Sequence, residues 1–287
     1  LAGKQFHYGF LGFSKSDTSI SHLNAVLQLL LHIQELVSME FLVTNMPRNS
    51  LSKSLSWLAR RMHSATAVRS TVSPAAVYAE INSLAGRPKT EDPVESLLFL
   101  LNTSLSSAIV DAIFRGKLSI SKHTTGSERT TQQQTPFLVL PVELSVVDLF
   151  PGTTSRSLHS YELEQLIGQR YNSGQMFPVN RSVSQAYDII GLPKCLFIVV
   201  KRFRRGDQGT VEKDKSIVKF NPHRLMVPLE GSMEGEEYTL IGAISHSDQH
   251  PSSPYSTFCC AGEGRWFELR DSVVRPTAVE AIQVTDV

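Results

Sequence analysis

Ser21 is the first residue that could act as a nucleophile in hydrolysis, and it opens a segment reading SHLNAVLQ. Apolar residues recur through this segment at the i, i+3, i+4 spacing of a buried helix. The start of a helix favours negative charge, because free N–H groups and the macrodipole point there. A serine hydroxyl has a pKa far above neutrality, so Ser21 could attack a substrate only with a positioned general base. Otherwise Ser21 is an N-cap, a role that serine commonly takes.

Three histidines are candidates for that base: His22, His246 and His250. A structural or surface role is the commoner one for an isolated histidine. The chain also has no Gly-x-Ser-x-Gly turn, the strained elbow that presents the nucleophile in many serine hydrolases. A hydrolase that uses Ser21 is therefore an alternative and not the leading interpretation.

Composition argues against several other classes of function. A net charge of +1 creates no global field for nucleic acid or a membrane. The cysteines Cys195, Cys259 and Cys260 form no Cys-x-x-Cys pair, which argues against a zinc site, and their odd number predicts a reducing compartment. No apolar run approaches the roughly 18 residues of a membrane span. We expect no metal, no cofactor and no membrane contact.

One basic cluster follows an apolar run near residue 200. Its cations are Lys201, Arg202, Arg204 and Arg205. The simpler interpretation is a solvated strand end, where exposed charges contribute little to stability. The functional alternative is a docking surface for a protein or for the phosphates of RNA.

Patterning divides the chain into a helical part, up to about residue 115, and a strand-rich remainder. Apolar periodicity and the cap signals Ser73-Pro74 and Asp92-Pro93 predict four helices, over 21–43, 50–63, 73–84 and 93–105. We expect strands at 117–121, 137–142, 195–200, 238–244, 256–261 and 265–269, a hairpin over 211–220, a short helix over 158–166 and a polar loop over 124–135. Helices followed by strands favour the α+β class.

Four boxes, taken in order, resemble the ubiquitin-specific proteases. In that family a cysteine opens a helix that reads roughly Cys-aromatic-Met-Asn-Ser-x-Leu-Gln, and Asn24, Leu27 and Gln28 match it. The other boxes lie at 91–98, at 196–203 and in a C-terminal block of 238–247, 253–255 and 266–271. The resemblance implies one domain over 1–287 with a papain-like right-hand fold. In this fold a helical thumb (1–115) precedes an antiparallel palm with reduced fingers (116–287).

The same resemblance implies that the catalytic machinery is replaced. Ser21 stands at the nucleophile position, and Ser19 stands where the family has its oxyanion-stabilising Asn. Pro254 occupies the position of the catalytic His and has no titratable group, and Arg270 occupies that of the orienting Asp. Asp271 survives beside Arg270, but strand alternation would direct it to the opposite face. We therefore expect a pseudoenzyme.

Local details at 24–28, 92–95, 114–118 and 211–220 resemble the inactive splicing-factor branch of this family, the tri-snRNP-associated pseudo-deubiquitinases. The implied function is a nuclear scaffold that assembles or stabilises the spliceosomal tri-snRNP through protein–protein contacts. That branch usually carries an N-terminal zinc finger, which this sequence does not contain. The alternatives are a module that binds ubiquitin or a ubiquitin-like protein without cleaving it, and a residual hydrolase that uses Ser21.

Overall fold

The computed structural model describes residues 10–14, 20–37, 49–64, 71–126, 130–144, 160–205, 211–246 and 255–284. The chain divides into two compact units, and the first contains residues 1–110 and 241–287 while the second contains 111–240. The sequence predicts a boundary near residue 115 between a helical part and a strand-rich part. In the structure the C-terminal strands group with the N-terminal helices instead. Within the described residues, no helix is long and apolar enough to cross a membrane.

The helices of the first unit are α1 (Ser21–Leu30), α2 (Gln34–Val37), α4 (Ser50–Ser64), α5 (Ala75–Ser83) and α6 (Pro93–Ser104), followed by α7 (Ser107–Ile113) at the boundary and α9 (Val279–Val284) near the end of the chain. The helix expected over 21–43 is wrong in length, because α1 ends at Leu30 and a separate short helix, α2, follows; residues 38–43 lie outside the described residues. The carboxylate of Asp92 caps α6 by accepting the Val94 N–H at 2.8 Å, as its Asp-Pro signal predicts. The predicted α5 cap is displaced by one residue, since the N-cap is Pro74.

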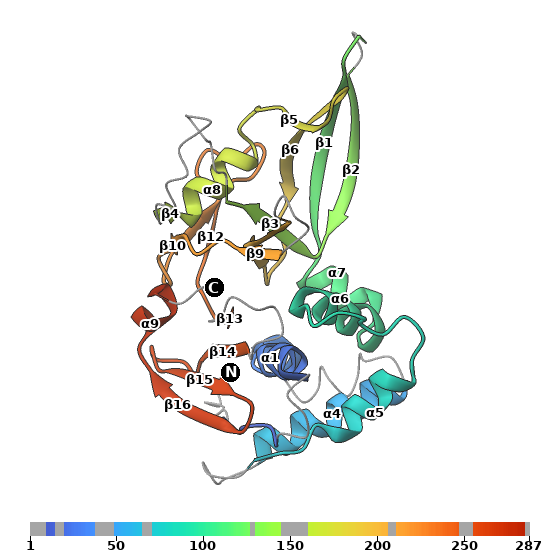
Figure 1. Ribbon diagram of the computed structural model, residues 1–287, viewed down its shortest axis with the longest axis vertical. Coiled ribbons are helices and arrows are strands. Elements are labelled where there is room, and N and C mark those ends of the chain that lie inside the picture. Colours follow the sequence, from blue (N-terminus) through green and yellow to red (C-terminus); the bar gives the residue numbers. More distant parts are fainter. Residues whose placement is uncertain are drawn as a thin grey trace, which may run out of the picture. The chain divides into compact units, whose positions relative to one another are not determined.

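A four-stranded antiparallel sheet completes the first unit. Its order is β13 (Gly242–His246), β14 (Tyr255–Cys260), β15 (Trp266–Arg270) and β16 (Val273–Thr277). Helix α1 lies against β13, β14 and β15 (Figure 1), and Val26 and Leu27 are fully buried. The Thr257 hydroxyl donates to the Ala25 carbonyl at 3.0 Å, which fixes the helix on the sheet.

The second unit contains a second antiparallel sheet, in the order β2 (Thr130–Phe137), β1 (Gly116–Thr124), β6 (Val183–Gly191) and β5 (Phe177–Asn180). The loop expected over 124–135 is wrong, because residues 130–135 belong to β2 and pair with β1. Almost every side chain of β2 is exposed, so the strand carries no apolar pattern. Its backbone hydrogen bonds to β1 form the strand instead.

The remaining strands of the second unit form four pairs. Two pairs are parallel: β3 (Val139–Glu143) with β7 (Phe197–Lys201), and β4 (Ser160–Glu162) with β10 (Ile217–Lys219). Two are antiparallel: β8 (Phe203–Arg205) with β9 (Val211–Lys213), and β11 (Leu225–Val227) with β12 (Glu236–Tyr238). The hairpin expected over 211–220 is therefore wrong, since β9 and β10 pair with other strands.

Helix α8 (Leu163–Arg170) contributes Leu166 and Ile167 to the core of this unit, beside Leu140 and Ile189. The short helix predicted over 158–166 is confirmed only from residue 163, because residues 160–162 form β4. The expected α+β class is confirmed in both units.

Candidate functional site

Ser21 lies at the first turn of α1, where the sequence places a nucleophile. Its side chain is buried, with 4% of its surface exposed. Its hydroxyl oxygen accepts a hydrogen bond from the Tyr255 N–H at 2.9 Å, at the start of β14. The N-cap of α1 is Ile20, which forms no side-chain cap, so the N-cap interpretation of Ser21 is wrong. Ser21 instead joins the first turn of the helix to the sheet.

Of the positions expected to supply a base, the structure describes His246 but neither His250 nor Pro254. The oxyanion position, Ser19, also lies outside the described residues. His246 is buried in β13, where it pairs with Tyr255 across the ladder. The two rings lie against each other, with centroids 4.6 Å apart. His246 is thus part of the packing around the site.

Tyr255, whose backbone N–H binds the Ser21 hydroxyl, carries a titratable phenol. Burial raises the pKa of its phenol to about 12, with a further contribution from the negative charges of Asp92 and Glu91. At neutral pH the phenol is therefore protonated, and it cannot serve as a base.

Arg270 and Asp271 stand where the family has its acidic pair. Arg270 ends β15 and is exposed. Asp271 follows in the turn to β16 with a φ of 50°, in the left-handed region that few non-glycine residues adopt. Arg270 is exposed whereas Asp271 contacts α1, so the two neighbours point in different directions, as strand alternation predicts. The Asp271 carboxylate accepts a hydrogen bond from the Asn24 side-chain amide at 2.7 Å.

Asn24 is the centre of a chain of three side chains. Its amide group donates to Asp271, and its carbonyl oxygen accepts a short hydrogen bond from the Tyr78 hydroxyl of α5. Burial raises the pKa of Tyr78 above its usual range, and the negative charge of Asp271 adds to this effect. The carboxylate is therefore held by α1 and α5 in a structural network. The sequence gives no signal for Tyr78, which lies 54 positions from Asn24.

The basic cluster near residue 200 divides into different roles. Arg202 is 5% exposed and donates to the carbonyls of Ser216 at 2.6 Å and Asp214 at 3.3 Å. The expectation that Arg202 is solvated is wrong, because its guanidinium is needed to satisfy buried carbonyls. Lys201 is exposed and forms an ion pair with Glu143 at 3.2 Å. Arg204 and Arg205 lie in β8, opposite β9.

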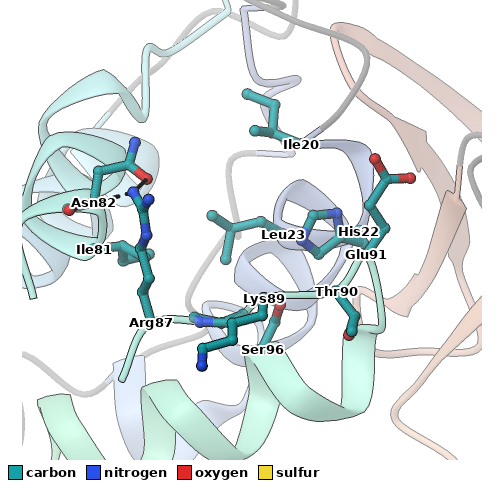
Figure 2. A pocket seen from close by; sticks show the side chains of 11 residues that line it. Ile20, His22, Leu23, Ile81, Asn82, Arg87, Lys89, Thr90, Glu91 and Ser96 are labelled. Carbon is teal, nitrogen blue, oxygen red and sulfur yellow. Dashed lines mark hydrogen bonds between the residues drawn. The ribbon is translucent and has the colours of Figure 1, made fainter. Parts of the chain in front are cut away.

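A pocket of about 400 Å³ lies beside the first turn of α1 (Figure 2). His22 and Leu23 of α1 face the loop that carries Arg87, Lys89 and Glu91. This loop is fixed by the carboxylate of Glu95, which accepts the Lys89 and Thr90 N–H groups at 3.1 Å each. The lining carries both signs of charge, from Arg87 and Lys89 and from Glu91.

No group of three or more His, Cys, Asp or Glu side chains suited to a metal ion occurs among the described residues. Cys195, Cys259 and Cys260 are free thiols, and burial raises the pKa of Cys259 above its usual range. Cys259 is fully buried while Cys260 is half-buried, as expected for neighbours on a strand.

One comparison with known proteins identifies the family of this chain, and another supports its fold. The model for "Ubiquitin carboxyl-terminal hydrolase" matches residues 15–286. No curated protein sequence shows significant similarity. Among solved structures, the chain is similar to a SAGA Ubp8/Sgf11/Sus1/Sgf73 DUB module bound to ubiquitin aldehyde, with 17% identity and a TM-score of 0.75 over 99% of this chain and 69% of that one.

Two further structures give the same result. A variant of the SAGA DUB module bound to monoubiquitin is 19% identical, with a TM-score of 0.74 over 99% of this chain and 69% of that one. A yeast SAGA module with a mutant Sgf73 is 17% identical, with a TM-score of 0.71 over 99% and 68%. At these identities the similarity concerns the fold.

Proposed function

The chain belongs to the ubiquitin carboxyl-terminal hydrolase family and has the ubiquitin-specific-protease fold, and from this premise we propose that it is a catalytically inactive member that serves as a scaffold for protein contacts. The observation that carries this proposal is the Ser21 hydroxyl, which is buried and bound to the Tyr255 N–H. A serine nucleophile needs a base that accepts its proton. Here the Ser21 oxygen accepts a hydrogen bond from a backbone donor.

The rest of the replaced machinery supports the same proposal. The family's catalytic His position is Pro254, and its orienting acid position is Arg270, whose charge has the opposite sign. The neighbouring acid, Asp271, is hydrogen-bonded to Asn24 and through it linked to Tyr78. This hydrogen bond gives the Asp271 carboxylate a structural role, because it links α1 to the turn after β15.

We place this scaffold in the nucleus, in pre-mRNA splicing, with proteins of the spliceosomal tri-snRNP as its partners. The support is the resemblance of 92–95, 114–118 and 211–220 to the inactive splicing-factor branch. The test is purification of the tagged chain from nuclear extract under native conditions, followed by identification of the co-purifying proteins. Enrichment of tri-snRNP subunits, unchanged by Ser21→Ala, is expected. Absence of these subunits from a folded, soluble bait would contradict the splicing role.

A second candidate is a module that holds ubiquitin without cleaving it. The fold similarity to modules solved with ubiquitin aldehyde and with monoubiquitin favours it. Calorimetric titration with monoubiquitin separates the two candidates. Saturable binding without hydrolysis supports the second, whereas tri-snRNP association without ubiquitin affinity supports the first.

A further inference from the structure

Helix α4 has two faces of opposite character. One face is buried and carries Leu51, Leu55, Leu58 and Met62. At 3.6 residues per turn the opposite face carries Lys53, Trp57, Arg60 and Arg61, and all four are exposed. We call these four residues the α4 outer face. Its helix lies in the first unit, beside α5 (Figure 1).

Trp57 is the unusual member of this face. Tryptophan is highly buried on average in folded proteins, yet 53% of Trp57 is exposed. The other tryptophan of the chain, Trp266, is 4% exposed. The four apolar residues on the inner side of α4 already supply its packing against the unit, so the indole of Trp57 is not needed there. An exposed indole on a regular helix is available to a partner.

The charged residues that α4 itself carries near Trp57 are all positive. Helix α4 contains no Asp or Glu, and Lys53, Arg60 and Arg61 all lie within about one turn, or roughly 6 Å along the axis, of Trp57. In the part of the chain that the structure describes, neither Lys53 nor Arg60 forms an ion pair. The adjoining helix α5 carries only one charged residue, Glu80. This concentration of positive charge stands out in a chain whose net charge is +1.

We propose that the α4 outer face is a docking surface for an acidic protein segment that packs an apolar side chain on Trp57. Charge complementarity requires an anionic partner. Tryptophan and arginine are the residues that most often dominate the binding energy of protein interfaces. A helix face with anchors at i, i+3 and i+4 suits a partner whose carboxylates lie one turn either side of an apolar residue.

Single-stranded RNA fits these observations less well. Three cations neutralise only a few phosphates, which gives a weak and strongly salt-dependent affinity. Proteins that bind single strands generally combine a basic groove with several aromatic side chains on which successive bases stack. The α4 outer face offers only one indole, that of Trp57. The surface is distinct from the replaced catalytic positions, so this inference stands whether or not the chain is inactive.

The test uses the full chain and an amphipathic peptide of Glu and Leu with one central Phe. Iodide quenching of tryptophan fluorescence reports on Trp57, because Trp266 is buried. Saturable protection from quenching by this peptide is expected, while the same peptide with Lys in place of Glu should give none. The double variant Lys53→Glu/Arg60→Glu should abolish protection. The matched control Lys122→Glu changes an exposed cation in the other unit and should leave protection intact.

A second titration, with labelled peptide and fluorescence anisotropy, reads the affinity without using Trp57. Trp57→Ala should weaken binding by roughly 30-fold, the loss typical of an interface hot spot. Circular dichroism confirms that each variant is folded. The proposal is overturned if the acidic peptide fails to bind, if Trp57→Ala leaves its affinity unchanged, or if Lys122→Glu is as damaging as the α4 double variant. It is also overturned if oligouridylate binds more tightly than the acidic peptide.

Discussion

Replacing Asn24 with alanine should remove the centre of the Tyr78–Asn24–Asp271 chain of hydrogen bonds. Asn24 is 2% exposed, so its two partners lose a buried contact that water does not readily replace. The bond to a carboxylate contributes about 2 kcal/mol and the phenol bond about 1 kcal/mol. We therefore expect Asn24→Ala to lower the free energy of unfolding of the first unit by about 3 kcal/mol.

Urea denaturation followed by tryptophan fluorescence measures this loss, because Trp57 and Trp266 both lie in the first unit. Asn102→Ala is the matched control, since its amide donates to the Leu98 carbonyl on the exposed surface of α6, and it should change stability by no more than about 0.5 kcal/mol. A cost for Asn24→Ala below about 1 kcal/mol would refute the network. So would full additivity with Tyr78→Phe, because residues in one network couple.

Three further predictions follow from the buried groups. Arg202→Ala should lower the free energy of unfolding of the second unit in urea by about 3 kcal/mol, because two carbonyls lose their donor. Lys201→Ala should lower it by at most about 0.5 kcal/mol. Equal losses would contradict the roles assigned to the two residues. Burial lowers the pKa of His32 to about 4. Between pH 6.5 and 4 the imidazole is therefore protonated in the unfolded chain and neutral in the folded chain. Stability should therefore fall from pH 6.5 to 4, by on the order of 3 kcal/mol, and His32→Phe should flatten that slope in urea titrations across this range. Ser21→Cys alone should not restore hydrolysis of a ubiquitin C-terminal amide, because no His stands at position 254 to protonate the leaving amine; turnover by this variant would reveal another acid.

Elements that bury a regular apolar face could be predicted from the sequence. Helix α4 follows its leucine spacing, and α6 starts at the predicted Asp92 cap. Strand β2 could not be predicted, because it is exposed and takes its structure from pairing with β1. The same limit explains the wrong hairpin over 211–220, since β10 pairs in parallel with the distant β4.

The candidate site also contains some features that the sequence predicts and others that it does not. The place of Ser21 at the start of a buried helix was predictable from local pattern. The hydrogen bond from Asn24 to Asp271 was not predictable, because the two residues lie 247 positions apart in the sequence. Arg202 was predicted to be solvated because the carbonyls that it satisfies lie 12 and 14 residues away along the chain. Contacts of this kind arise from tertiary packing and leave no local sequence signal.

Hydrolysis of ubiquitin carrying a C-terminal fluorogenic amide tests most directly whether the replaced site does any chemistry. The rate should equal that of buffer for the native chain and for Ser21→Ala, because losing single members of a catalytic triad already removes most of its rate enhancement. Mass spectrometry after incubation with a ubiquitin-tail electrophile should find Ser21 unmodified. Turnover above buffer, or labelling of Ser21 that Ser21→Ala abolishes, would contradict the account.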